Sequence, residues 1–260
     1  MKNQSEKAAI FRALHERDRA FIIPNPWDIG SAKMLEALGF EALATTSWGF
    51  AYSIGKADGA VDRDTMLAHA AQLAAATDLP VSADLENGYA DEPAGVAETV
   101  RLAAAAGLAG CSIEDLPLGR EAGPYDIDFA AARVRAAVEA ARALPFSFVL
   151  TARAENFIAD RPDLADTIAR LRAFADAGAD VVYAPGLRTE EEIGAVVRAV
   201  DRPLNVLVGL AGMTMTLDDL SRIGVRRISV GSGLARVAYS AARSVATEMH
   251  ERGSFAGLSR

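Results

Sequence analysis

The chain has few of the features that would place it outside the cell or in a membrane. Its 260 residues include one cysteine, Cys111, so no internal disulfide bond can form. It contains no run of about 20 apolar residues, the length needed to cross a bilayer. No apolar segment of signal-peptide type follows Met1. We therefore expect a cytoplasmic protein with no membrane partner.

Positive charge is also scarce. The chain has 35 Asp and Glu residues against 27 Lys and Arg residues, which gives a formal net charge of −8, and no basic cluster offsets it. A nucleic-acid partner is therefore not expected, because nucleic-acid surfaces require concentrated positive charge. A small anionic substrate is compatible with this composition if a bound metal ion or one arginine supplies positive charge locally.

A pattern of short β-branched runs, each followed by an alanine- and leucine-rich helical segment, repeats along the chain. After an amphipathic helix expected over residues 4–17, about eight such pairs follow, as in a (β/α)8 barrel. With 51% hydrophobic residues and no linker, residues 1–260 are predicted to form one α/β domain, a (β/α)8 TIM-type barrel. A doubly wound sheet would need a glycine fingerprint after the first strand, where the sequence reads Asn-Pro-Trp-Asp from Asn25.

The strands are expected at residues 21–24, 42–46, 81–84, 110–114, 147–153, 181–184, 204–208 and 227–230. The helices between and after them are expected at residues 28–38, 62–77, 93–106, 128–143, 161–177, 189–200, 217–223 and 235–252. The N-terminal helix is expected to pack outside the barrel or to cap one end. His15, His69 and His250 are predicted on helix surfaces and Cys111 in the core, so none of them is a candidate ligand.

Charged side chains collect where three successive strands end. Strand side chains alternate between faces, so Asp84 faces the barrel interior on the third strand, Glu114 on the fourth and Arg153 on the fifth. The carboxyl ends of all strands of such a barrel meet at one rim, where ligands bind. These side chains are therefore predicted to converge, and Glu86 can reach the same cation as Asp84.

The predicted set of donors favours a hard cation. Asp84, Glu86 and Glu114 offer oxygen ligands without histidine or thiolate, which favours Mg²⁺ or Mn²⁺ over zinc. Because Mg²⁺ keeps several waters and often takes only one or two carboxylates directly, Asp58 could hold a coordinated water. The alternative is an ion-pair network between the carboxylates and Arg153 without a metal ion.

With these positions identified, the chain resembles the isocitrate lyase/phosphoenolpyruvate mutase family over nearly its full length. The family's Asp-x-Asp/Glu-x-Gly-Tyr-Gly metal loop is matched from Asp84 onward, with Ala90 in place of the last glycine. Its Ile-Glu-Asp run is matched around Glu114, and its Thr/Ala-Arg strand end is matched at Arg153. These motifs are specific in combination, although each would be weak alone.

Two further segments after the second strand are similar to the family. The Thr-Ser-Trp-Gly run around Ser47 resembles its substrate-carboxylate turn, and the Gly-x-x-Asp segment ending at Asp58 resembles the one whose aspartate holds a metal-bound water. The resemblance implies Mg²⁺ bound directly by Asp84, with Asp58, Glu86 and Glu114 acting mainly through water. The implied catalytic residues are Arg153, Ser47 and Glu114, and the implied substrate-binding residues are Asn25, Ser47, Trp48, Gly49 and Arg153.

The loop after the fourth strand, residues 116–125, separates activities within the family. Isocitrate and methylisocitrate lyases carry a Lys-x-Cys-Gly-His segment there, whose cysteine is the acid–base group, and phosphonomutases carry a gating segment with lysine and asparagine. This chain has neither. With two glycines and two prolines, the loop is expected to be a mobile gate.

The chain is therefore more similar to members acting on 2-oxo acids, such as oxaloacetate decarboxylase-type enzymes. This implies a Mg²⁺-dependent C–C lyase or decarboxylase that forms a pyruvate-type enolate from a small 2-oxo or 2-hydroxy (di)carboxylic acid. Decarboxylation requires no proton to be taken from a hydroxyl group, so it can proceed without the cysteine. The alternatives are a P–C bond enzyme of the phosphoenolpyruvate mutase or phosphonopyruvate hydrolase type, and a non-catalytic 2-oxo-acid binding protein.

The last expected helix suggests that the chain associates with other copies of itself. Its alanine-rich segment, residues 235–249, is apolar enough to need burial against another surface. The resemblance implies a homo-oligomer, a tetramer built as a dimer of dimers in which the C-terminal helix is exchanged between subunits.

Overall fold

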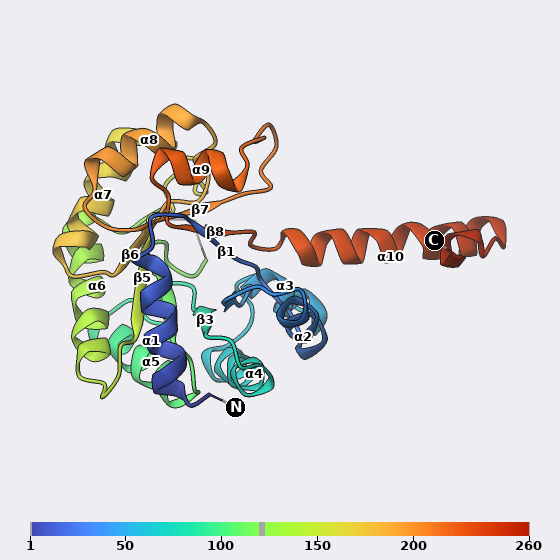
Figure 1. Ribbon diagram of the computed structural model, residues 1–260, viewed down its shortest axis with the longest axis horizontal. Coiled ribbons are helices and arrows are strands. Elements are labelled where there is room, and N and C mark those ends of the chain that lie inside the picture. Colours follow the sequence, from blue (N-terminus) through green and yellow to red (C-terminus); the bar gives the residue numbers. More distant parts are fainter. Residues whose placement is uncertain (1, 120–122, 260) are drawn as a thin grey trace.

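The structure, a computed structural model, describes residues 2–119 and 123–259. Within these residues, eight parallel strands form one sheet in the order β1-β8-β7-β6-β5-β4-β3-β2. The amide of Ala44 donates to the carbonyl of Pro24 (3.1 Å) and links the two ends of that order, so the sheet curls into a nearly closed barrel. The predicted (β/α)8 TIM-type barrel is confirmed (Figure 1).

All eight expected strands are present. Those at residues 81–84 and 110–114 have the expected bounds, and the other six are shorter. The strands are β1 (Phe21–Ile23), β2 (Leu43–Ala44), β3 (Val81–Asp84), β4 (Gly110–Glu114), β5 (Val149–Arg153), β6 (Val181–Tyr183), β7 (Leu204–Leu207) and β8 (Arg227–Ser229).

The helices of the described chain agree with the expected ranges within a few residues, with two additions, α3 and the short C-terminal η1. They are α1 (Gln4–His15), α2 (Ile29–Ala37), α3 (Ser47–Ser53), α4 (Arg63–Ala76), α5 (Pro93–Ala105), α6 (Ile127–Arg142), α7 (Leu164–Asp176), α8 (Glu190–Ala199), α9 (Leu217–Ile223) and α10 (Gly233–Arg252), followed by the 3₁₀-helix η1 (Ala256–Ser259). None of these helices is long and apolar enough to cross a membrane.

Helix α3 is an addition, because no helix was expected between the second strand and residue 62. Its sequence, with glycine and three aromatic residues, has poor intrinsic helix propensity. Thr46 starts the helix as its N-cap by accepting a hydrogen bond from the Gly49 amide (3.2 Å). The result is that Ser47 and Trp48 stand directly at the mouth of the barrel instead of on a flexible loop.

Helix α1 caps the amino end of the barrel (Figure 1). Its Phe11 packs into a small core with Phe21, Val149 and other inward side chains of the strands. Gly110 makes this approach possible, because a Cβ there would lie 2.5 Å from the Val149 carbonyl oxygen and 3.0 Å from the Phe11 ring. With this end filled, the carboxyl ends of the strands form the open mouth.

The larger core lies between the strands and the surrounding helices. Cys111 is completely buried in it, as predicted, together with Val81, Ala83 and Ile113, which point away from the barrel axis. Burial raises the pKa of the Cys111 thiol, so this side chain is a small apolar residue and not a nucleophile.

The prediction that all three histidines lie on helix surfaces was wrong for two of them. His15 packs edge-on against Phe11 (ring centroids 4.8 Å apart), and its Nδ1 bonds the Phe11 carbonyl (2.7 Å). His69 stacks on Phe50. Burial lowers the pKa of His15 to about 3 and that of His69 to about 4, so both are neutral members of the core. His250 is exposed, as expected.

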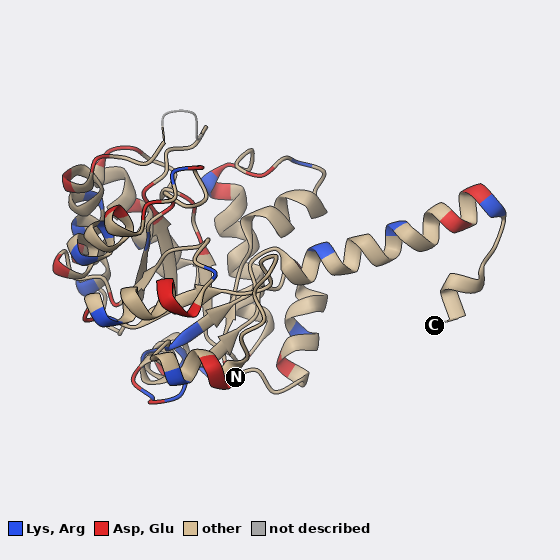
Figure 2. Ribbon diagram, turned by 90° about the horizontal axis from the view of Figure 1, so that it is seen from above, with Lys and Arg blue, Asp and Glu red and all other residues tan. Residues whose placement is uncertain are grey.

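Helix α10 extends away from the barrel (Figures 1 and 2). Among its residues only Ala235 is buried, whereas Val237 is 68% exposed and Met249 is also open to solvent. Phe255 and Leu258, beyond the helix, are likewise exposed. Apart from the contacts of Tyr239 with Trp27 and Tyr52 and of Arg236 with Trp48, the described residues leave most apolar side chains of α10 exposed.

Candidate active site

A cavity of about 300 Å³ opens at the carboxyl ends of the strands, at the small end of the usual size range for ligand sites. Carboxylates outnumber arginines in its lining by five to three. These charged residues are Asp58, Asp84, Glu86, Glu114, Glu155, Arg153, Arg227 and Arg236. The excess of negative charge suits a divalent cation bound together with an anionic ligand.

Arg153 lies at the centre of the acidic group. Its Nη1 donates to Asp84 Oδ1 (2.8 Å), and its Nη2 contacts Glu114 Oε2 (3.2 Å). Glu155 Oε1 accepts from Nε (3.0 Å) and also lies 2.9 Å from Nη2. Asp84, Glu114 and Arg153 therefore lie together, as strand alternation predicts. Glu155 was missed, although it continues the alternation two residues beyond Arg153.

Burial sets the protonation chemistry of this group. It raises the pKa of Glu114 well above its usual range, and the positive charge of Arg153 offsets only part of that effect. Burial also raises the pKa of Glu155, and the positive charge of Arg153 again acts against that increase. Burial by itself would lower the pKa of Arg153, but the surrounding carboxylates raise it, so the guanidinium stays charged. Glu114 is thus suited to hold or release a proton.

The acidic loop after β3 is conformationally strained. Glu86 (φ 50°) and Tyr89 (φ 55°) both have left-handed backbones that cost free energy for residues with side chains. Gly88 (φ 82°) has no such cost. Such strain persists where the surrounding contacts enforce it, and it directs Glu86 into the cavity lining.

Arg133 of α6 enforces this loop geometry. It is 1% exposed, and its guanidinium donates to the carbonyls of Asn87, Ala90 (2.8 Å) and Asp91 (2.8 Å). It also donates to the carbonyl of Glu114 (3.1 Å), so one side chain fixes both acidic loops. Sequence reasoning missed Arg133 because a single arginine within a helix is no motif.

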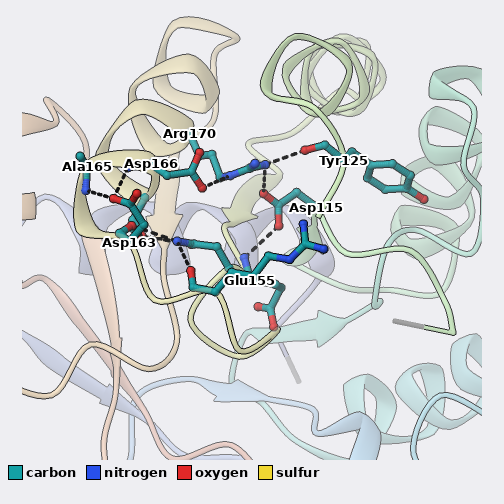
Figure 3. A network of polar contacts seen from close by, with 10 residues as sticks. Asp115, Tyr125, Glu155, Asp163, Ala165, Asp166 and Arg170 are labelled. Atoms are coloured by element: carbon teal, nitrogen blue, oxygen red, sulfur yellow. Dashed lines mark hydrogen bonds and ion pairs between the residues drawn. The ribbon is translucent and has the colours of Figure 1, made fainter. Parts of the chain in front are cut away.

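Asp115, the last residue of the Ile-Glu-Asp run, is not part of the cavity lining and belongs to a supporting network (Figure 3). Its Oδ1 accepts from the amide of Glu155 (2.8 Å), and its Oδ2 contacts Arg170 Nη1 (3.0 Å). Arg170 also donates to Asp166 (2.8 Å) and to the carbonyl of Tyr125 (2.7 Å). The network holds the Glu155 backbone, and with it the carboxylate that contacts Arg153.

The turn at the start of α3 forms one wall of the cavity. The amide of Ser47 donates to Asp84 Oδ2 (3.3 Å), so the predicted carboxylate turn touches the predicted metal ligand. Trp48 lines the same wall, with the Arg236 guanidinium 4.1 Å above its ring. Gly49 lies beneath the turn, where its amide is occupied by the N-cap bond.

Asn25 lines the cavity, but its polar atoms tie the barrel together. Its Nδ2 donates to the carbonyl of Thr45 (2.9 Å), and its Oδ1 accepts from the amides of Val230 (3.0 Å) and Gly231 (2.9 Å). Because these groups lie beside β2 and β8, Asn25 links the two ends of the sheet at the point where the barrel closes. Its expected role in substrate binding would add to this positioning role.

The rim beside the ends of β3 and β4 carries the remaining predicted acid and part of the predicted gate. Asp58 is exposed there and shares a second, shallower hollow with Glu86, Glu114 and residues 117–119. Residues 120–122 of the expected gate lie outside the described residues, so gating by residues 116–125 stays a prediction.

The carboxylates fit a hard cation that keeps most of its waters. In the described part of the chain, no three His, Cys, Asp or Glu side chains converge closely enough to form an all-protein metal centre. Mg²⁺ commonly needs only one or two direct carboxylates. The side chain of Asp84 is 19% exposed, against 4% for Glu114 and 3% for Glu155, so Asp84 is the accessible member of the ion-pair network.

A barrel of this kind, with an acidic cavity at its carboxyl ends, is an enzyme architecture. The sequence matches the phosphoenolpyruvate phosphomutase family over residues 11–250. The chain therefore belongs to the isocitrate lyase/phosphoenolpyruvate mutase family, whose members are lyases and mutases.

Individual relatives agree with this assignment. A Burkholderia cenocepacia J2315 crystal structure, described provisionally as a lyase/mutase, is 57% identical, with a TM-score of 0.96 over 98% of this chain and 92% of that one. An oxaloacetate decarboxylase of Paraburkholderia xenovorans is 31% identical over 85% of this chain and 74% of its own length. Oxaloacetate acetylhydrolase in complex with its product oxalate is 29% identical, with a TM-score of 0.88 over 98% and 90% of the two chains.

Proposed function

We propose that the protein is a Mg²⁺- or Mn²⁺-dependent lyase or decarboxylase that cleaves a C–C bond in a small 2-oxo or 2-hydroxy dicarboxylic acid through a pyruvate-type enolate. The observation that carries this proposal is Arg153, fixed by three carboxylates at the mouth of the barrel beside the accessible Asp84. The relatives named for oxaloacetate support the substrate class.

The residues predicted from the sequence each have a part in this proposal. Asp84 would hold the metal ion directly, with Glu86, Glu114 and Asp58 acting through water. When bound, the ion would polarise the 2-oxo group and stabilise negative charge on it. Ser47 and the amide of Trp48 would orient the carboxylate, with Asn25 holding the adjoining turn, whereas Gly49 would support this turn through its bond to Thr46.

Arg153 and Glu114 would serve the chemical step. Arg153 would donate hydrogen bonds to the oxygen on which the enolate charge develops, an effect that is strong in a site partly closed to water. Because burial raises the pKa of Glu114, its carboxyl group favours the protonated form and can donate a proton to the enolate carbon, after which solvent would reprotonate it.

The proposal is tested by comparing turnover of oxaloacetate, isocitrate, 2-methylisocitrate and phosphonopyruvate with Mg²⁺. We expect oxaloacetate-type acids to react fastest, because the loop lacks the cysteine that would act on the hydroxyl of isocitrate. Faster turnover of phosphonopyruvate would instead establish the P–C bond alternative. Binding of 2-oxo acids without turnover of any of them would establish the non-catalytic alternative.

We also propose that the protein is a homo-oligomer, a dimer of dimers in which α10 packs against another subunit, and that it is cytoplasmic. The support is the exposed apolar surface of α10 described above. Light scattering at micromolar concentration is expected to give a multiple of 27.4 kDa, and Val237→Lys to reduce that mass. A monomer mass for the unaltered chain would contradict the proposal.

A further inference from the structure

Arg227 is a second buried arginine of the cavity, and its surroundings differ from those of Arg153. It lies on β8 with its side chain inside the barrel, and it is 5% exposed. Its Nε donates to Asn205 Oδ1 (3.0 Å), whereas its Nη1 is buried and has no hydrogen-bond partner in the described residues. No carboxylate of the described chain forms an ion pair with it, whereas Arg153 contacts three.

A buried guanidinium without a counter-charge is unfavourable. Even after relaxation, taking one ion out of water costs several kcal/mol, and proteins usually offset this with a paired opposite charge. Burial lowers the pKa of Arg227 to about 10, an effect to which the charge of Arg153 adds, so the side chain is still protonated at neutral pH. The cavity therefore contains a fixed positive charge whose partner must come from outside the described chain.

The contacts around Arg227 fix its position without neutralising it. Asn205 is 1% exposed, and while its Oδ1 accepts from Arg227, its Nδ2 donates to Ser229 Oγ (3.0 Å). Because both the oxygen and the nitrogen of the Asn205 amide are hydrogen-bonded, its oxygen stays directed at the Arg227 guanidinium. Tyr183 also lines this part of the cavity, and its ring is 5.1 Å from the Arg153 guanidinium carbon, so it stands beside both arginines.

We propose that Arg227 binds a second anionic group of the substrate, so that the cavity selects small acids with two carboxylates over acids with one. The proposed function supplies the position of the first carboxylate, beside Asp84 and Ser47, and the inference rests on it in that respect. Arg153 is unsuited to the second carboxylate because it already contacts Asp84, Glu114 and Glu155, and the donor capacity that it has left is assigned to the enolate oxygen in the proposed function. Arg227 has donor capacity left and no protein carboxylate to displace.

The test uses two ligands that differ in the second carboxylate, 3,3-difluorooxaloacetate and pyruvate, each measured by calorimetry with Mg²⁺ present. In Arg227→Met, we expect the Kd of difluorooxaloacetate to rise by at least about 30-fold, as for loss of one partner of a buried charge pair. The Kd of pyruvate should change by less than about threefold, within ordinary context effects. Arg226→Met is the matched control, because the neighbouring Arg226 is half-buried and, within residues 2–119 and 123–259, its side chain donates only to the backbone carbonyls of Asp18 and Gly224.

A second variant keeps the arginine in place. Asn205→Asp would give Arg227 a protein carboxylate at the position of the present 3.0 Å hydrogen bond, so it should cause the same selective loss of difluorooxaloacetate binding. Neither variant should lower the melting temperature of the unliganded protein, because one removes an unpaired buried charge and the other pairs it. A melting temperature that falls in both would show that Arg227 serves the fold instead.

The outcomes separate this inference from the proposed function. Equal losses for both ligands in Arg227→Met, an unchanged Kd for difluorooxaloacetate, or failure of the unaltered protein to bind it would overturn the inference. Dianion binding that depends on Arg227 without turnover of any acid would sustain the inference and reject the lyase proposal. Oxaloacetate turnover by Arg227→Met with the KM of the unaltered protein would sustain the lyase proposal and reject the inference about Arg227.

Discussion

Replacing Arg153 with methionine is expected to lower kcat by about 10²- to 10³-fold, the usual loss when one fixed donor to a developing oxyanion is removed. The KM should change much less, because the interaction strengthens as the enolate forms. Steady-state kinetics with oxaloacetate and Mg²⁺ measures both quantities. Arg153→Lys is the informative companion, because it keeps the charge but loses the fork that reaches Asp84, Glu114 and Glu155 at once.

The same substitution should destabilise the fold by about 3–5 kcal/mol, because it leaves buried carboxylates without their cation. This loss should depend on pH. Burial raises the pKa of Glu114 and of Glu155 above the unfolded value, and removing Arg153, which opposes that shift, raises both further. Groups that bind a proton more tightly in the folded state add stability at low pH, and this contribution is lost as the pH rises through the folded pKa.

Urea unfolding of Arg153→Met should therefore show a smaller deficit at about pH 5 than at about pH 8. Arg226→Met again controls for loss of one arginine. A deficit that is the same at both pH values, or a KM that rises while kcat is unchanged, would mean that Arg153 binds substrate without organising the acids.

Strand periodicity was sufficient to predict three of the charged side chains that meet at the mouth. Asp84, Glu114 and Arg153 were placed together because inward positions recur at every second residue and parallel strands end at one rim. The same rule, extended two residues past Arg153, would have found Glu155. Helix α3 was missed because its N-cap and its packing form it against its intrinsic propensity. Its composition therefore does not indicate a helix.

Residues that act through long-range contacts could not be predicted in this way. Arg133 joins α6 to carbonyls of two loops more than 40 and about 20 residues away, and only the packed barrel brings these groups together. His15 was expected at the surface because helical spacing alone did not show that α1 caps the barrel and buries this face. Arg227 stands in an ordinary Arg-Arg pair, and its lack of a counter-charge is apparent only once the strands close around it.

Asp84 is expected to be the residue on which metal binding depends most. It is the most exposed of the three carboxylates around Arg153, and its second oxygen faces the Ser47 amide at the mouth, so it can reach an ion without a large rearrangement. Glu86 and Glu114 are almost completely buried and would act through coordinated water. Their individual contributions to metal affinity should therefore be smaller than that of Asp84.

Asp84→Asn should weaken Mn²⁺ binding by more than about 10²-fold, beyond the 10- to 100-fold typical of residues that support a metal site indirectly, whereas Glu86→Gln should fall within that range. Titration of Mn²⁺ followed by electron paramagnetic resonance measures this without reference to activity. Glu92→Gln is the matched control, because this exposed acid near the loop makes no capping bond. Turnover should cease in excess chelator and return with Mg²⁺. Unchanged Mn²⁺ affinity in Asp84→Asn would reject Asp84 as the main metal ligand, and turnover that survives chelation would leave Arg153 to stabilise the enolate without a metal ion.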